Sequence, residues 1–239
     1  MKIRKDEKTD FYKMALLLLA GYTFFCAAAP SFAEEEWTEI NKKDGISIYS
    51  KKVPGSDILA FKGVTEIEVG IGRIIDIIND KSRHGEWVSR LVETKALSFI
   101  SPLESIEYIR VKGRWPVSDR DLVFSSKAEI DEISRTVKIS MHSVTDRSMP
   151  DQKGVIRGEL MESTYLLQEL DGGKTRIEAS FYGDPKGWLP TWIINYFQKS
   201  WPYTTLINLR RQAARNDLEM HNYSSLAEYY VDTRDKGSQ

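Results

Sequence analysis

The chain has 239 residues, of which 41% are hydrophobic and 29% charged, which is typical of an ordered globular protein and excludes a disordered one. Its formal net charge of −1 at pH 7 gives no bulk attraction to nucleic acid, so we expect no nucleic-acid partner. One domain of about 200 residues is expected once the N-terminal segment is set aside.

The first 33 residues, 1–33, have the pattern of an export signal. Five basic residues precede the apolar run 14–29, and Ser31 and Ala33 supply small residues for a cleavage site. We expect cleavage after Ala33 and a periplasmic or secreted protein. The alternative is an N-terminal membrane anchor, although the run is slightly short for a spanning helix. Cleavage would remove Cys26, the only cysteine, and with it any disulfide, thiol nucleophile or cysteine metal ligand.

The remaining chain, residues 34–232, predicts strands, one helix, more strands and a long final helix. A short helix or turn is expected over 34–43, and a hairpin of two strands at 46–50 and 58–69. Five isoleucines between residues 71 and 78 recur at helical spacing, which predicts an amphipathic helix up to Asp80. Alternating or apolar segments then predict strands at 91–100, 105–112, 121–130, 136–145, 155–169 and 174–182.

This element order indicates an α+β fold. The strands follow one another through short turns, which favours an antiparallel sheet over parallel crossovers. A long sheet of this kind curls, and the C-terminal helix is the natural filler of its concave face. Leu226, Tyr229 and Tyr230 predict a short additional helix, and residues 233–239 form a polar tail.

The segment 183–211 is the most aromatic part of the chain. It holds Trp188, Trp192 and Trp201, and its apolar residues occupy more than one side of the expected helix. Pro190 suits the first helical turn, and Pro202 is expected to interrupt and kink the helix. Two interpretations stay open from these residues alone: an aromatic core helix, or a lid over an apolar cavity.

Few residues have a pattern that indicates catalysis. His84, His142 and His221 lack metal-ligand spacing, and no acidic cluster supplies further ligands, so we expect no metal. No phosphate-binding loop, dinucleotide fingerprint or serine-hydrolase elbow occurs, and we expect no cofactor. Arg120 and Asp121 are adjacent on a strand and face opposite ways, which favours a structural role at the strand entry.

Three segments resemble the START (steroidogenic acute regulatory protein-related lipid-transfer) family. They are RWPVSDRD at 114–121, GDPKGWLP with the following WIIN at 183–195, and Trp37 with the turn and strand start at 43–46. They occur in the family's order and spacing, and the resemblance covers residues 36–216. It implies a helix-grip fold, in which a curved antiparallel sheet wraps a C-terminal helix around an internal apolar cavity.

The resemblance also implies a gate. In the family, the last helix and a loop between two late strands are thought to open at a membrane. The corresponding residues here are Gly187 and Trp188 at the helix entry, and Met149 at the tip of the loop 146–153.

Glu107 lies where some family members place a carboxylate inside the tunnel. Its usual basic partner would fall at Ser126, so the chain departs from that pattern. A carboxylate without a partner is costly in an apolar tunnel. Glu107 therefore either lines the cavity or faces solvent, and Arg110 could pair with it only through a bulge. The residues expected to line the cavity are Glu107, Val123, Met141, Tyr165, Phe181, Trp192, Tyr196 and Leu206.

We therefore expect a monomeric, non-catalytic protein that binds a lipid or another hydrophobic molecule, transfers it, and contacts membranes transiently. Two alternatives stay open. One is a cyclase-like or hydrolase-like enzyme on the same scaffold, for which Glu107, Tyr165 and His142 are the available polar groups. The other is a lipid sensor that binds without transfer.

Overall fold

A computed structural model describes residues 36–114, 116–217, 225–228 and 230–231. The expected export signal at 1–33 and the polar tail at 233–239 lie outside these ranges, as do Trp115, His221 and Tyr229. The described residues belong to one compact unit.

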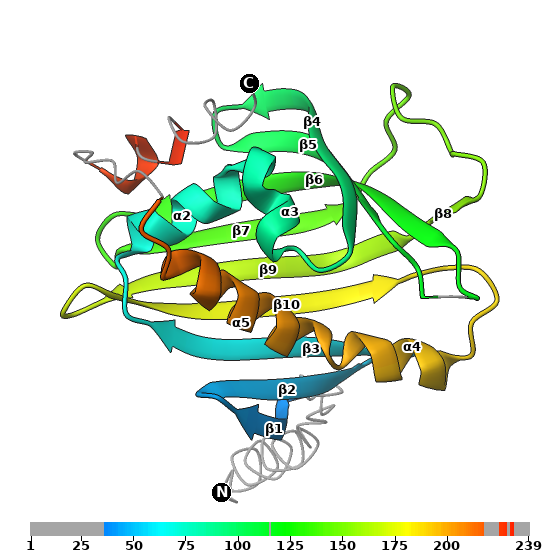
Figure 1. The fold of residues 1–239 in the computed structure, drawn as a ribbon, viewed down its shortest axis with the longest axis horizontal. Helices are drawn as coiled ribbons and strands as arrows, with labels where there is room; N and C mark the ends of the chain where they lie inside the picture. Colours follow the sequence, from blue (N-terminus) through cyan, green and yellow to red (C-terminus); the bar gives the residue numbers. More distant parts are fainter. Residues whose placement is uncertain (1–35, 115, 218–224, 229, 232–239) are drawn as a thin grey trace, which may run out of the picture. The chain divides into compact units, whose positions relative to one another are not determined.

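A curved sheet of ten strands makes up most of this unit (Figure 1). Its strand order is β1-β2-β3-β10-β9-β7-β6-β5-β4 with antiparallel neighbours throughout, and β8 pairs in parallel with β6. The strands are β1 Thr38–Lys43, β2 Ile46–Val53, β3 Ser56–Ile67, β4 Leu91–Ser101, β5 Glu104–Val111, β6 Asp119–Asp131, β7 Thr136–Ser143, β8 Val155–Arg157, β9 Glu159–Leu170 and β10 Lys174–Asp184.

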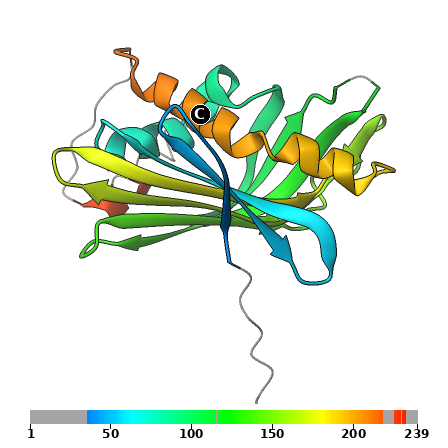
Figure 2. The same ribbon diagram turned by 90° about the horizontal axis from the view of Figure 1, so that it is seen from below.

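The C-terminal helices lie across the concave face of this sheet, as the view from below shows (Figure 2). The helical elements are α2 Ile71–Asn79, η1 Lys81–Arg83, α3 His84–Trp87, α4 Thr191–Gln198 and α5 Trp201–Ala213. The predicted α+β architecture, a curved antiparallel sheet wrapped around a C-terminal helix, is therefore confirmed.

The start of the domain differs from the prediction. Residues 38–43 form strand β1 instead of a helix or turn, and β1 pairs with β2. Asp44 and Gly45 both have positive φ, at 51° and 71°. Two successive residues with positive φ make the type of turn that joins twisted antiparallel strands closely. The Asp-Gly pair therefore specifies a hairpin, and residues 38–43 become its first strand.

The strand predicted at 155–169 is two strands. β8 ends at Arg157, and β9 begins at Glu159. Between them the N–H of Gly158 donates a 2.9 Å hydrogen bond to the carbonyl oxygen of Asp121. A Cβ atom at Gly158 would lie 3.1 Å from Leu122 Cδ2, so the close approach of two backbones marks the break.

The C-terminal helix is also divided. The prediction of one helix kinked at Pro202 is corrected to two helices, α4 and α5, separated at Lys199 and Ser200. Pro202 lies in the first turn of α5, where its missing N–H has no intrahelical partner to lose. The proline therefore begins the second helix instead of bending a single one. The predicted short helix near the C-terminus is present, since Leu226 and Tyr230 are helical and Tyr230 is buried.

The core lies between α2, α5 and the concave face of the sheet. Buried isoleucines of α2 pack with β7, β9 and β10 residues and with Leu206 and Leu209 of α5. α5 approaches β3 most closely at Gly63, where an added Cβ would lie 2.7 Å from Leu206 Cδ1 and 2.9 Å from Pro202 Cβ. The absence of a side chain at Gly63 therefore allows α5 to seat on the sheet.

Gly63→Ala should destabilise the fold by roughly 1–3 kcal/mol, because the added methyl group overpacks the contact with α5. Urea unfolding of the purified protein measures this as a lower midpoint at an unchanged slope. Gly70→Ala is the matched control, since nothing lies within 4 Å of its added Cβ. Equal midpoints for the two variants would contradict the close contact.

Candidate functional site

The concave face of β5, β6 and β7 carries a mixed polar and apolar wall. The strand register places Glu107 opposite Phe124, and Phe124 opposite Ser143. Side chains alternate between the two faces of a sheet. Ser105, Glu107 and Ile109 of β5 therefore share the concave face, and Glu107 is only 8% exposed. This settles the alternative left open by the sequence, since Glu107 points inward and not to solvent.

Glu107 has a basic partner that the sequence analysis missed. Lys81 Nζ of η1 lies 2.9 Å from Glu107 Oε2, and both side chains are about nine-tenths buried. Ser105 Oγ donates a 2.8 Å hydrogen bond to Glu107 Oε1. Lys81 precedes Glu107 by 26 residues and follows a helix, so strand spacing carried no signal for the pair. Arg110 instead pairs with Asp119 at 2.8 Å, on the other face of β5.

His84 lies beside this ion pair. Its Nε2 atom is 2.8 Å from the carbonyl oxygen of Ile78, and its ring packs edge-on against Trp87 at 5.4 Å. Burial, together with the positive charge of Lys81, lowers the pKa of His84 from 6.5 to about 4. His84 is therefore uncharged at neutral pH.

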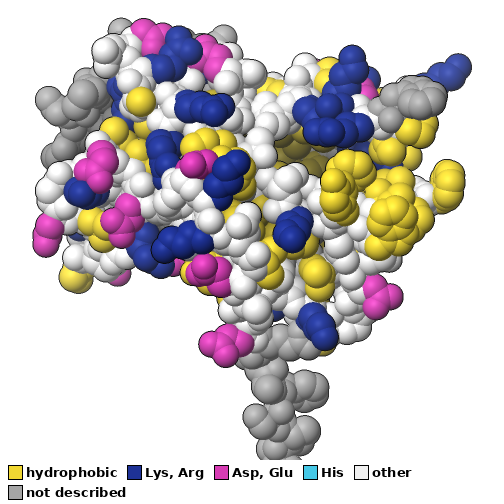
Figure 3. Space-filling model, turned by 60° about the horizontal axis from the view of Figure 1, so that its bottom comes forward, with side chains coloured by type: hydrophobic (Ala, Val, Ile, Leu, Met, Phe, Trp, Pro, Cys, Tyr) yellow, Lys and Arg dark blue, Asp and Glu magenta, His cyan; other side chains and the backbone are white. Residues whose placement is uncertain are grey.

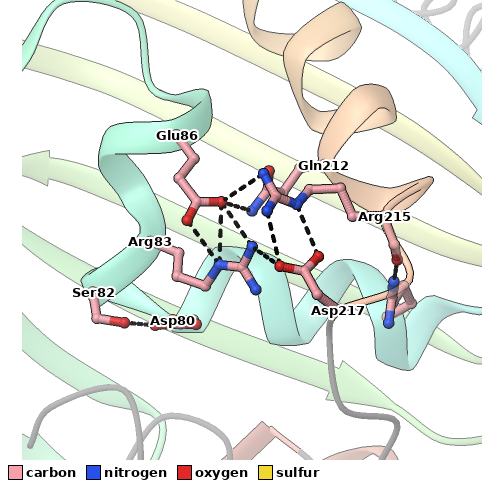
Figure 4. A network of polar contacts seen from close by, with 8 residues as sticks. Asp80, Ser82, Arg83, Glu86, Gln212, Arg215 and Asp217 are labelled. Carbon is pink, nitrogen blue, oxygen red and sulfur yellow. Dashed lines mark hydrogen bonds and ion pairs between the residues drawn. The ribbon is translucent and has the colours of Figure 1, made fainter.

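A surface network holds η1 and α3 to the end of α5 (Figure 4). Glu86 accepts hydrogen bonds from Arg83 at 2.8 Å and from Gln212 at 2.7 Å. Asp217 accepts bonds from Arg215 at 2.8 Å and from Arg83 at 3.0 Å. Arg83 lowers the pKa of Glu86, and Arg215 lowers that of Asp217, so both carboxylates are ionised at neutral pH. This network fixes the element that carries Lys81.

Apolar residues next to the ion pair remain accessible although they face the concave side. Ile109, Leu122 and Met141 are half-buried, whereas concave residues nearer α2, such as Leu167 and Ile177, are fully buried. The end of the sheet near α4 is therefore covered less tightly than the end near α2. Figure 3 shows a hollow at this end, with hydrophobic side chains on its floor and Lys and Arg side chains at its rim. We call this half-covered part of the concave face the concave site.

Aromatic side chains gather on the outside of α4 and the residues before it (Figure 3). Trp188 is 92% exposed, Trp192 71% and Tyr196 72%. Trp192 and Tyr196 lie four residues apart on α4 and therefore share one side of the helix, and Trp188 precedes the helix. Arg114, in the connection between β5 and β6, lies over the ring of Phe197 of α4 at 6.0 Å.

The predicted cavity residues do not all lie together. Glu107, Met141 and Tyr165 lie on the concave wall. Phe181 is half-buried against Trp201, with ring centroids 5.1 Å apart, and Leu206 is a fully buried core residue.

Trp192 and Tyr196 do not line a cavity in this structure. Both face outward on α4, because the short helix turns its Ile194 side to the sheet.

The structure places Val123 and Met149 on the outer face of the sheet. This corrects the predictions that Val123 lines the cavity and that Met149 belongs to a gate. They pack with Tyr108 in a small second core that is separate from the concave face. Val123 is opposite Tyr108 and therefore points away from Phe124. Met149 is 6% exposed, and Arg157 donates a 3.3 Å hydrogen bond to its carbonyl oxygen. The loop tip is therefore packed against the sheet and does not present Met149 to solvent.

Arg120 and Asp121 face opposite ways, as predicted, and each has its own partners. Arg120 donates to the carbonyl oxygens of Pro185 and Lys186 at 3.3 Å, so it attaches the segment before α4 to β6. Asp121 is 1% exposed and pairs with Arg157 at 2.8 Å. Gly187 adopts a left-handed φ of 77° beside Arg120, which suits its position at the entry of α4.

A second hollow of about 350 Å³ lies on the outer face, over β2, β3, β9 and β10. Trp37 covers it, with Lys51 Nζ and Lys62 Nζ at 5.2 and 5.0 Å from its ring centroid. Lys62 also pairs with Glu178 at 3.5 Å. Across the described residues, no group of three His, Asp or Glu side chains is placed to hold a metal ion.

Comparison with known sequences identifies the family. A sequence model of the START domain matches residues 28–204. The chain belongs to the START family. An uncharacterized protein of Pseudomonas aeruginosa is 27% identical over 203 residues, which cover 84% of this chain and 98% of that protein. The phosphatidylcholine transfer protein of Rattus norvegicus is 24% identical over 175 residues, which cover 72% of this chain and 80% of that protein.

Solved structures share the fold of this START domain. The crystal structure of human STARD10 superimposes with a TM-score of 0.70 at 17% identity, covering 90% of this chain and 82% of that chain. A STAR-related lipid transfer protein fragment from Xanthomonas axonopodis gives a TM-score of 0.67 at 22% identity, covering 75% of this chain and 99% of that fragment. These similarities confirm the helix-grip fold expected from the sequence.

The lowered pKa of His84 predicts a pH-dependent stability. Between pH 6.5 and 4 the unfolded chain binds a proton at His84 that the folded domain does not, so this residue reduces stability as the pH falls. Between pH 7 and 4 the free energy of unfolding of the parent should fall, and that of His84→Asn should fall by about 3 kcal/mol less. Urea unfolding at both pH values measures the difference. His142→Asn, an exposed site, should follow the parent, and identical losses for all three proteins would contradict the buried, neutral histidine.

Proposed function

We propose that this START domain binds one lipid in the concave site and transfers it between membranes without catalysis. The observation that carries the proposal is the half-buried apolar wall of Ile109, Leu122 and Met141 on the concave face of the sheet. A lipid chain placed there restores dispersion contacts and removes apolar surface from water at about 25 cal/mol per Å². Relatives named as lipid transfer proteins support the same function.

Passage of a lipid requires an opening, and α4 is the part of the C-terminal helices with the fewest attachments. Ile194 is its only buried residue. Asn195 accepts a 2.9 Å hydrogen bond from Leu59 N and donates one of 3.0 Å to Asp57 O. Gln198 donates a 2.7 Å bond to Gly183 O. Breaking these contacts exposes little apolar surface, so the opening of α4 costs little free energy.

α5 is attached far more strongly. Leu206 and Leu209 are fully buried. Arg210 donates a 2.7 Å bond to Asp44 O, and Asn208 a 2.9 Å bond to Trp87 O. The network around Glu86 holds its last turn. In our proposal α4 therefore swings away while α5 stays in place, with Lys199 and Ser200 as one hinge and Gly187 as the other.

The exposed aromatic face of α4 supports contact with a membrane surface. Tryptophan and tyrosine rings favour the interface between lipid and water, where one side of the ring is apolar and its polar atom stays wet. Trp192 and Tyr196 present such rings on one side of α4, and Trp188 exposes another just before it. In this mechanism the helix that meets the membrane is also the helix that opens the concave site. The loop with Met149 is not needed as a second gate.

Export through the pattern at residues 1–33 supports action in the periplasm or outside the cell, on envelope lipids. Within the part of the chain that the structure describes, none of the helices is both long and apolar enough to cross a bilayer. We propose that the domain acts as a monomer, because one copy contains the wall, the ion pair and the gate.

The arrangement of polar groups gives little support to the enzymatic alternative. Glu107 and Tyr165 face the concave side, but His142 lies on the outer face of β7 and is exposed. The three groups that a cyclase or hydrolase could have used therefore do not converge on one substrate. A lipid sensor remains the other alternative, and an assay of lipid transfer separates it from a carrier.

A tether on α4 should slow lipid exchange at least tenfold. Both tethers are disulfides introduced in a Cys26→Ser background. The first, Asn195→Cys with Leu59→Cys, joins α4 to β3. The second, Asn208→Cys with Ser89→Cys, joins α5 to the segment before β4. Transfer of a fluorescent phospholipid between two vesicle populations is measured before and after reduction of the disulfide. The α5 tether is the control and should leave transfer unchanged, because α5 does not move in this mechanism.

The parent protein in the same experiment tests the proposed function. Transfer confirms a carrier, whereas binding of lipid without transfer indicates a sensor. If native mass spectrometry shows no bound lipid and no hydrophobic probe binds, the proposed function is wrong. Equal transfer rates in the oxidised and reduced α4-tethered protein would remove α4 from the mechanism.

Replacement of Trp188 and Trp192 by alanine should weaken vesicle binding about tenfold or more, because two exposed rings that enter the membrane interface are lost. Vesicle co-sedimentation measures the affinity, and the fold should be intact because both residues are exposed. Ile133→Ala is the matched control, since Ile133 is 97% exposed at a turn away from α4. A similar loss in both proteins would show that the aromatic face has no special role.

A further inference from the structure

Two hydroxyl groups on the concave wall are not used by the fold. Ser126 of β6 lies opposite Met141 of β7, and Met141 opposite Ser163 of β9. Tyr165 follows two residues after Ser163 and shares its face. Among the described residues, the hydroxyls of Ser126 and Tyr165 have no hydrogen-bond partner, whereas Ser163 Oγ donates a 2.8 Å bond to Ser180 O.

The surroundings of Tyr165 place its side chain against an open space. Tyr165 is half-buried, although Leu167 and Ala179, its neighbours on the same face, are fully buried. Burial raises the pKa of Tyr165 above its usual range, and no hydrogen bond offsets that effect. The hydroxyl of Tyr165 is therefore free to donate a hydrogen bond to a ligand oxygen that enters this space.

The buried charged groups near these hydroxyls cancel one another. Lys81 and Glu107 form a close ion pair. His84 is uncharged at neutral pH, as its lowered pKa shows. The wall therefore offers hydrogen bonds without net charge. A charged ligand group that displaced Lys81 or Glu107 from this pair would leave the other member buried and unpaired, which is costly.

We propose that the polar end of the bound lipid is uncharged, as in a glyceride with hydroxyl and ester groups, and that Tyr165 and Ser126 hydrogen-bond it. The inference rests on the proposed lipid binding and specifies its ligand class. β6 and β9 lie about 10 Å apart across β7. A glycerol ester group together with the long tyrosine side chain covers that distance.

A competition experiment tests the ligand class. The purified protein is incubated with vesicles that contain equal amounts of dioleoylglycerol, phosphatidylcholine and phosphatidylglycerol, and the bound lipid is identified by native mass spectrometry. We expect dioleoylglycerol to exceed phosphatidylglycerol at least tenfold among the bound lipids. Predominant binding of phosphatidylglycerol or phosphatidylcholine would overturn the inference but keep the proposed function. Binding of no lipid would overturn the proposed function itself.

Tyr165→Phe tests the named contact, because it removes only the hydroxyl. We expect dioleoylglycerol to bind about five- to tenfold more weakly, while diphenylhexatriene, which has no polar group, binds as it does to the parent. Tyr182→Phe on β10 is the control, since Tyr182 lines the outer hollow. Unchanged dioleoylglycerol binding, or an equal loss for both probes, would contradict the role of Tyr165.

Glu107→Gln tests the role of charge independently. It leaves Lys81 without its carboxylate partner and gives the wall a positive charge. In the competition experiment the share of phosphatidylglycerol should then rise at least fivefold relative to the parent. An unchanged share in a folded variant would show that electroneutrality does not select the ligand.

Discussion

The seating of α5 on β3 is the contact on which the rest of the site depends. Gly63 lets Leu206 and Pro202 approach the strand closely, and any larger residue would hold the helix away. With α5 in this place, its last turn meets η1 and α3 through Gln212 and Glu86. η1 in turn brings Lys81 to Glu107. A glycine that touches neither member of the ion pair therefore helps to position it.

The same contact divides the C-terminal helices into a fixed and a detachable part. α5 buries more of its residues than α4 does, and the exposed aromatic residues lie on the detachable side. The concave wall changes along the same direction, from fully buried isoleucine and leucine to half-buried residues such as Ile109, Met141 and Tyr165. A binding protein needs this difference in burial between the two ends of its core. A uniformly packed core would leave no space for a ligand, and a uniformly loose one would not fold.

The site was predicted less well than the fold, for reasons that particular residues make clear. Val123 was assigned to the concave face, but a difference of one residue reverses the face of every side chain in a strand. Periodicity shows that a strand has two faces without showing which one the helix covers. Trp192 and Tyr196 were expected inside because aromatic residues are usually buried, yet α4 uses Ile194 for packing. Lys81 was missed because it reaches Glu107 from a different element.

The sequence by itself determined the order and type of most elements. The isoleucine spacing of α2, the alternating strands and the family-like segments at 114–121 and 183–195 rest on local patterns, which act within a few residues. A local pattern also determined the β1–β2 turn, since the Asp44-Gly45 pair adopts the two positive φ angles that the turn requires. Only the tertiary structure decided which strand face is concave, where α4 separates from α5, and which cation neutralises Glu107. These depend on contacts between residues far apart in the chain, and no local period records them.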